Sequence, residues 1–266
     1  MIFQTVTLDS AGPNVTLTLY LADVSHPLRD AILVIPGGGY GCVCSDREGE
    51  PIALAFLARG MNAFVLNYTV KPANPYQPLM DASLAMSWIK ENADTCFVDP
   101  ERVFVVGFSA GGHLAASLGT MWHDETLNRQ IRIKPESNRP AGMILCYPVI
   151  GVEGHPDSFQ NLLGAAFGDE TLMHSFSVHE RVSDKTCPAF LIHTASDKTV
   201  PVRNSLMMAD ALHANHIPFE MHIYPEGPHG MALANSDTNM GRAELTDAAY
   251  ARWVDDAVIW MNRLRG

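Results

Sequence analysis

The sequence predicts an α/β protein in which a mostly parallel sheet of about eight strands is flanked by helices on both faces. Two observations lead to this prediction. Short continuous apolar segments alternate along the chain with segments of helical periodicity, which is the pattern of buried parallel strands joined by crossover helices. The 266 residues also contain no internal repeat and no linker rich in Gly, Ser or Pro, so residues 1–266 are expected to form a single domain.

The expected elements follow one another through the whole chain. Residues 3–8 and 15–21 are rich in β-branched residues with partial alternation and predict a leading hairpin. The other strands are expected at residues 31–35, 62–68, 103–108, 142–147, 189–194 and 219–224. Helices are expected at residues 50–60, 79–93, 111–119, 202–216 and 248–265. In such a sheet the crossovers are right-handed, and functional residues gather at the carboxyl ends of the strands.

Two stretches interrupt this alternation. Residues 120–140 and 149–187 are long and polar and are expected to be irregular. Long loops in a compact domain are often functional. The second stretch leaves the carboxyl end of a predicted strand, so both stretches are expected to shape the mouth of a site at that edge.

Composition argues against several classes of function. A net charge of −11 gives no general attraction for nucleic acid, and the apolar runs are too short to span a membrane. The start of the chain lacks the features of a signal peptide, so a cytoplasmic location is expected. The odd number of cysteines, five, fits reduced thiols in that compartment. Cys42 and Cys44 form a C-x-C pair with no second pair to complete a zinc site, so no metal is expected.

Ser109 is the strongest candidate for a nucleophile. Residues 107–111 read Gly-Phe-Ser-Ala-Gly and match G-x-S-x-G between a predicted buried strand and a predicted helix. A serine on such a sharp turn has strained backbone and close neighbours, and Gly107 and Gly111 leave room for them. A chance glycine-rich turn is the alternative, and the strand–turn–helix context argues against it.

A serine nucleophile needs a base, and eleven histidines compete for that role. His229 alone combines a place after the last strand with a loop at the carboxyl edge of the sheet. His193, near the end of its strand, is a candidate for the pocket lining.

The acid that orients the base is expected at Asp197, in the loop after residues 189–194. The alternative role for Asp197 is to cap the helix near residue 202. Its place ahead of His229 gives the order Ser, Asp, His that is typical of G-x-S-x-G hydrolases. Asp184 and Asp210 do not follow the carboxyl end of a strand.

Backbone amides are expected to bind the developing oxyanion. Ala110 supplies one amide because it follows the nucleophile, and the glycine-rich residues 36–41 supply the others. Glycines directly after a strand let the backbone approach a substrate oxygen. A phosphate-binding loop is the competing interpretation, but neither G-K-[ST] nor G-x-G-x-x-G follows.

Taken together, these motifs resemble the α/β-hydrolase superfamily, and within it small acetyl-esterase-like proteins described as acetyl xylan or sugar-ester esterases. The resembling stretches are residues 36–41, 45–68, 99–117, 161–164, 193–212 and 227–231. The resemblance implies an α/β-hydrolase fold, a triad of Ser109, Asp197 and His229, hydrolysis of short-chain carboxylic esters, and no metal or organic cofactor.

Two departures from the wider lipase group bear on the site. Pro36 stands where those lipases often have His, and the glycine amides that follow can still donate; Gly38 and Gly39 are favoured over Gly37. The N-terminal segment is too short for a large helical cap, so an open site for small acyl groups on polar alcohols such as sugars is expected.

The main hypothesis is therefore a serine esterase whose partner is a small-molecule ester, above all a carbohydrate ester. The alternative is a formamidase similar to kynurenine formamidase with the same triad. That activity needs an aromatic pocket, for which the candidates are Tyr40, Trp122, Tyr147 and Phe167. A more remote alternative is a non-catalytic ligand-binding protein. Assembly into a homo-oligomer stays open.

Overall fold

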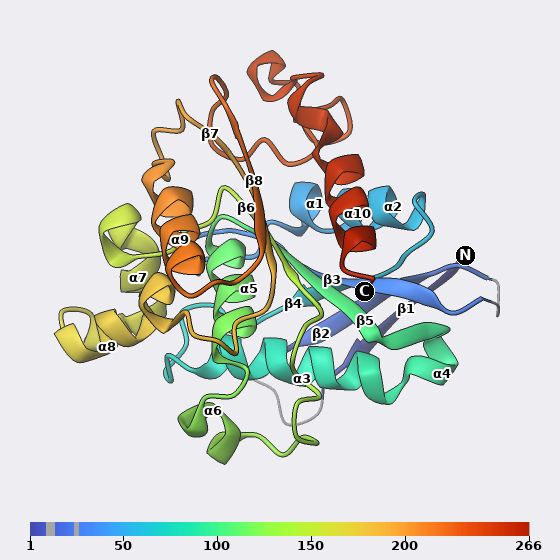
Figure 1. Cartoon of the computed structure of the whole chain (residues 1–266), viewed down its shortest axis with the longest axis horizontal. Coiled ribbons are helices and arrows are strands. Elements are labelled where there is room, and N and C mark those ends of the chain that lie inside the picture. Colours follow the sequence, from blue (N-terminus) through green and yellow to red (C-terminus); the bar gives the residue numbers. More distant parts are fainter. Residues whose placement is uncertain (9–13, 24–26, 266) are drawn as a thin grey trace.

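A computed structural model describes residues 1–8, 14–23 and 27–265 (Figure 1). This part of the chain contains one sheet of eight strands in the order β1-β2-β4-β3-β5-β6-β7-β8. The strands are β1 (Ile2–Thr7), β2 (Thr16–Leu21), β3 (Arg29–Ile35), β4 (Asn62–Asn67), β5 (Val98–Phe108), β6 (Met143–Cys146), β7 (Ala189–Thr194) and β8 (Phe219–Tyr224). β1 pairs antiparallel with β2, β2 pairs antiparallel with β4, and every other pairing is parallel. The predicted mostly parallel sheet is confirmed.

The leading hairpin pairs as predicted, with Ile2 opposite Leu21 and Thr7 opposite Thr16. Most of the residues expected to connect its strands, 9–13, lie outside the described part of the chain. β5 is the longest strand and begins five residues earlier than its apolar run 103–108 suggested. Its amino half is only partly buried, which is why hydrophobicity alone did not reveal it.

Helices cover both faces of the sheet (Figure 1). On one face lie α3 (Gln77–Glu91), α5 (Ala110–Met121) and α9 (Arg203–Ala214), whose apolar side chains share one buried cluster. On the other face α2 (Glu50–Leu57) and α10 (Trp253–Arg263) form a second cluster. β5 divides its side chains between them, since Val103 and Val105 belong to the first and Phe104 and Val106 to the second. This alternation is the period-two pattern of a strand buried on both faces.

The two stretches expected to be irregular contain short helices, so that expectation was wrong. Residues 120–140 include α6 (Glu125–Gln130), and residues 149–187 include α7 (Pro156–Leu163) and α8 (Glu170–Phe176). Asp124 caps α6 and Asp169 caps α8 by accepting backbone amides of the first turn. Two further helices of four residues each were also missed, α1 (Ser45–Glu48) and α4 (Ala93–Cys96). Helices of one or two turns are too short for periodicity to reveal.

The described residues contain no separate cap domain over the strand ends, as expected. Residues 149–187 form the longest excursion from the sheet, and both α7 and α8 contact α5, where His113 meets the ring of Phe159 and the carbonyl of Phe176 (Figure 1). None of the described helices combines the length and the apolarity that crossing a membrane requires.

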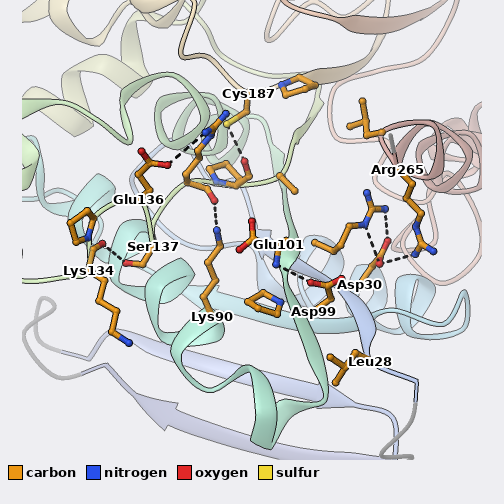
Figure 2. Close-up of a pocket in the computed structure, with 18 residues that line it drawn as sticks. Leu28, Asp30, Lys90, Asp99, Glu101, Lys134, Glu136, Ser137, Cys187 and Arg265 are labelled. Atoms are coloured by element: carbon orange, nitrogen blue, oxygen red, sulfur yellow. Dashed lines mark hydrogen bonds and ion pairs between the residues drawn. The ribbon is translucent and has the colours of Figure 1, made fainter.

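A hollow of about 890 Å³ lies at the amino ends of the strands, opposite the edge where β5 ends at Phe108 (Figure 2). Several of its charged side chains are engaged by other groups of the protein. Asp30 accepts from Arg102 at 2.7 Å and from Arg265 at 2.8 Å, and Lys90 Nζ donates to the carbonyl of Arg139 at 2.7 Å. This hollow is therefore a poor candidate for the reactive site.

Candidate active site

Ser109 lies at the turn between β5 and α5, as predicted. Its backbone has φ 54° and ψ −119°, a strained conformation for a residue with a side chain. The amide of Ser109 donates to the carbonyl of Cys146 at 3.0 Å, and its carbonyl accepts from the amides of His113 and Val149. The strained turn is thus held by β6 on one side and by the first turn of α5 on the other.

The flanking glycines are required by contact with backbone. A Cβ on Gly107 would collide with the carbonyl oxygen of Gly111, and a Cβ on Gly111 would collide with the carbonyls of Ile35 and Pro36. Neither neighbour is a flexible side chain that could move aside. The spacing of G-x-S-x-G therefore has a direct steric cause in this protein.

We expect Gly111→Ala to lower the free energy of unfolding by about 3 kcal/mol or more, because the new methyl group must displace two backbone carbonyls. Gly119→Ala in the same helix is the matched control. There the nearest atom is the sulfur of Met143, which can move. Urea unfolding of both variants measures the difference, and equal destabilisation would contradict the steric explanation.

The three predicted side chains Ser109, His229 and Asp197 meet at the carboxyl edge of the sheet. Ser109 Oγ lies 2.8 Å from His229 Nε2, and His229 Nδ1 lies 2.7 Å from Asp197 Oδ2. Because an ionised carboxylate only accepts, Nδ1 carries the proton and Nε2 accepts from the serine hydroxyl. His229 is 16% exposed at its side chain and Asp197 is buried, so the base alone of this pair reaches the surface.

Asp197 divides its two oxygens between two tasks. Oδ1 accepts from the amides of Thr199 and Val200, both at 2.9 Å, while Oδ2 faces His229. The capping role considered for Asp197 is therefore met in a turn within residues 197–200, ahead of α9. Asp197 fills this role in addition to its contact with the imidazole of His229. Burial alone would raise the pKa of Asp197, but hydrogen bonds from His193 and His229 outweigh it and hold the pKa well below the ordinary value.

Two other histidines near the site are structural. His193 is fully buried, with Nδ1 2.8 Å from Ser205 Oγ and Nε2 2.9 Å from the carbonyl of Val200. Its Nε2 also lies 3.4 Å from the carboxylate of Asp197 and helps to hold that carboxylate in place. His193 therefore does not line a pocket. His113 in α5 is also buried, and burial lowers its pKa to about 4.

The glycine loop borders Ser109 at Gly37 and continues into two glycines whose amides are unpaired among the described residues. The amide of Gly37 donates to Glu48 Oε2 at 2.8 Å. The amides of Gly38 and Gly39 have no acceptor among the described residues, and neither does that of Ala110. Gly38 and Gly39 adopt φ 127° and φ 61°, which glycine tolerates best. This geometry agrees with the assignment of Gly38, Gly39 and Ala110 as oxyanion donors.

A polar rim beside the glycine loop is formed by His155, just before α7, and by Ser158 and Asn161 within it. Residues 149–187 were predicted to shape the mouth of the site, but no role was predicted for these three side chains. Asn161 Nδ2 donates to the carbonyl of Gly39 at 2.9 Å, and Ser158 Oγ lies close to Gly39. His155 precedes α7, and its Nδ1 accepts from the amide of Ser158. Burial lowers the pKa of His155 more than nearby Asp157 raises it, so the imidazole is neutral near pH 7 and carries its proton on Nε2.

The four aromatic candidates for a formamidase pocket do not form one wall. Tyr40 is buried with its hydroxyl 2.7 Å from His113 Nδ1, and Tyr147 is buried with its ring packed edge-on against His229. Trp122 follows the far end of α5, about 20 Å from Ser109 for 13 residues at 1.5 Å per residue, so its proposed place in the pocket was wrong. Phe167 lies beyond α7 and is 38% exposed.

Comparison with known proteins gives consistent matches. The family model described as BD-FAE matches residues 17–212. Endo-1,4-beta-xylanase B of Butyrivibrio fibrisolvens is 43% identical over 85% of this chain, and the acetylxylan esterase of Xylanibacter ruminicola is 31% identical over 78%. The chain spans only 35% and 42% of the lengths of these two relatives.

A solved structure resembles nearly the whole chain. It is an acetyl ester-xyloside bifunctional hydrolase from Caldicellulosiruptor lactoaceticus, with a TM-score of 0.79 and 38% identity. The match covers 94% of this chain and 88% of that one.

Proposed function

The chain belongs to the BD-FAE family of α/β-hydrolase esterases, and from this we propose that it hydrolyses short-chain carboxylic esters, above all acetyl esters of sugars. One observation carries the proposal. The hydroxyl of Ser109, the imidazole of His229 and the carboxylate of Asp197 form a continuous hydrogen-bonded chain, with distances of 2.8 Å and 2.7 Å, at the mouth of a glycine loop. We also propose that residues 1–266 form a single domain.

The proposed reaction proceeds through an acyl-enzyme. Ser109 Oγ attacks the ester carbonyl carbon while His229 Nε2 takes the hydroxyl proton, and Asp197 stabilises the imidazolium. The amides of Gly38, Gly39 and Ala110 bind the oxyanion, and each such donor contributes about 3 kcal/mol to the transition state.

The tetrahedral intermediate then breaks down. The bond to the alcohol breaks, and the alcohol leaves with the proton from His229. Water repeats the sequence with His229 as base, which releases the carboxylic acid and restores Ser109. These steps use only side chains and backbone amides of the protein, and they need no metal or organic cofactor.

The preference for a sugar alcohol is supported by the rim. His155 offers a neutral N–H donor, Asn161 lies against Gly39, and the exposed Lys71 lies near Gly41. Such groups can hydrogen-bond the hydroxyls of a carbohydrate. The names of two relatives, an acetylxylan esterase and an acetyl ester-xyloside hydrolase, point to the same class of substrate.

We expect p-nitrophenyl acetate to be hydrolysed with a kcat/KM at least equal to that of the octanoate ester, because an open site gives a long acyl chain no extra binding energy. Acetylated xylose is expected to exceed N-formylkynurenine about 100-fold, since the aromatic candidates do not surround Ser109. Steady-state assays on both pairs measure these ratios, with Ser109→Ala as the blank for spontaneous hydrolysis. Faster cleavage of N-formylkynurenine would favour a formamidase, and no cleavage of any substrate would favour a binding protein.

A further inference from the structure

Glu48, at the end of the four-residue helix α1, is an acid outside the triad that is only 1% exposed. We infer that Glu48 is a positioning residue that holds the glycine loop and the His229 loop in fixed register with each other. The inference rests on the proposed ester hydrolysis and adds a second carboxylate to it. It follows from the contacts of the two carboxylate oxygens of Glu48, one on the glycine-loop wall of the site and the other on the His229 wall.

On one wall, Glu48 and Cys44, the residue just before α1, hold both backbone polar groups of Gly37. Glu48 Oε2 accepts from the amide of Gly37 at 2.8 Å, and the amide of Cys44 donates to the carbonyl of Gly37 at 3.0 Å. A Cβ at Gly37 would lie 3.0 Å from the Cβ of Ser109, so this peptide segment borders the nucleophile. The next two residues are the proposed oxyanion donors, and their amides keep their direction only if Gly37 stays in place.

On the other wall, Glu48 reaches the base through Tyr147. The Tyr147 hydroxyl donates to Glu48 Oε1 at 2.9 Å and accepts from the amide of Ala232 at 3.0 Å. The Tyr147 ring packs against the imidazole of His229, with centroids 5.1 Å apart and planes at 72°. The Tyr147 side chain thus packs beside the imidazole of His229 and also holds the backbone at Ala232, three residues after His229.

Arg47 adds a second link between the same two segments. Its Nη1 donates to the carbonyl of Gly230 at 3.3 Å, next to His229, and its Nη2 lies 3.8 Å from Glu48 Oε1. α1 therefore contacts the His229 loop directly through Arg47 and indirectly through Glu48 and Tyr147, and it contacts the glycine loop through Glu48. The glycine loop and α1 are near each other in the sequence, and the His229 loop is far from both.

The energetics fit a positioning role. A buried carboxylate is stable only when its oxygens are paired, and Glu48 accepts two hydrogen bonds and has one cation nearby. Tyr147 has φ 37°, a left-handed conformation that a bulky residue rarely adopts. The buried carboxylate of Glu48 and the strained backbone of Tyr147 therefore lie together, between the proposed oxyanion donors and His229.

The test compares Glu48→Leu with Glu48→Gln, which keeps an oxygen that accepts from Gly37. Glu48→Leu is expected to lower kcat for p-nitrophenyl acetate about 100-fold with KM within about threefold, because misdirected amides weaken only the transition state. Affinity for a short trifluoromethyl ketone, which forms an oxyanion on binding, should fall by a similar factor. Glu48→Gln should recover at least about tenfold of the lost kcat.

Asp30→Asn is the matched control, because Asp30 is a mostly buried acid at the opposite edge of the sheet, paired with Arg102 and Arg265. It should lower the melting temperature and leave kcat unchanged. A Glu48→Leu variant that behaves like Asp30→Asn, with normal kcat and reduced stability, would overturn the inference.

Hydrogen exchange separates this inference from the proposed function. In Glu48→Leu, amide exchange should accelerate together in residues 36–44 and 225–232, whether or not the wild type cleaves esters. Faster exchange in only one of these segments, or in neither, contradicts a link between them. An inactive wild type with coupled acceleration would overturn the proposed ester hydrolysis and support the positioning role.

Discussion

Replacing Ser109 by Ala is expected to lower kcat for p-nitrophenyl acetate by about 10⁴- to 10⁶-fold without unfolding the protein. The change removes only Oγ, the atom that lies 2.8 Å from His229 Nε2. The backbone bonds that hold the turn, from Ser109 to Cys146, His113 and Val149, do not involve the hydroxyl. Residual hydrolysis should come from water acting in the site with the oxyanion donors still in place.

Steady-state kinetics and urea unfolding of the same preparation measure this prediction. Ser236→Ala is the control, since Ser236 is exposed and lies in the loop region after β8. A Ser109→Ala variant that keeps more than about a tenth of the wild-type kcat would show that another group attacks the ester.

Asp197→Asn is expected to lower kcat about 10⁴-fold, because the substitution reverses the tautomer of His229. The introduced amide would keep its carbonyl oxygen toward the backbone N–H groups of Thr199 and Val200, which leaves its NH₂ group facing His229 Nδ1. A donor at that position places the imidazole proton on Nε2, which then cannot accept from Ser109. Kinetics with p-nitrophenyl acetate at pH 7 to 8 measure the loss.

Exposed Asp210 in α9 supplies the control as Asp210→Asn, which should leave kcat unchanged. The pH dependence of stability is a second check. The pKa of Asp197 is lowered in the folded protein, so its ionised form stabilises the fold above the ordinary pKa near 3.8, and this contribution is lost as the pH falls. The difference in free energy of unfolding between wild type and Asp197→Asn should therefore shrink below about pH 4. A difference that grows on acidification would contradict the assigned contacts.

Local patterns were enough for the parts of this protein that depend on neighbouring residues. The run 103–108 reads as a buried strand because both of its faces are apolar, and G-x-S-x-G marks the strained turn that follows. The order of Ser109, Asp197 and His229 then placed all three at the carboxyl edge of the sheet, where the structure has them within hydrogen-bond distance.

The parts that were missed depend on approaches between distant segments. Glu48 stands in a polar stretch that looks solvent-exposed, and only the packing of α1 against Tyr147, just after β6, and against the His229 loop buries it. His155 directly precedes a helix of eight residues inside a polar segment, where neither spacing nor periodicity gives a signal. Trp122 was misplaced for the opposite reason, since a position 13 residues after the nucleophile says nothing about which end of the helix faces the substrate.

The crossover from β6 to β7 has a consequence for how this protein can diversify. Residues 149–187 leave the carboxyl end of β6, contribute α7 to the rim, and return to the amino end of the neighbouring β7. Both attachment points are set by the ladder between adjacent parallel strands, and doubling the length of such a loop costs only about 0.6 kcal/mol of closure entropy. Insertions or exchanges here can therefore change the rim beside the glycine loop while the strands that precede Ser109 and Asp197 keep their register. Residues 149–187 are therefore a suitable segment to graft between related proteins or to vary in focused libraries for directed evolution.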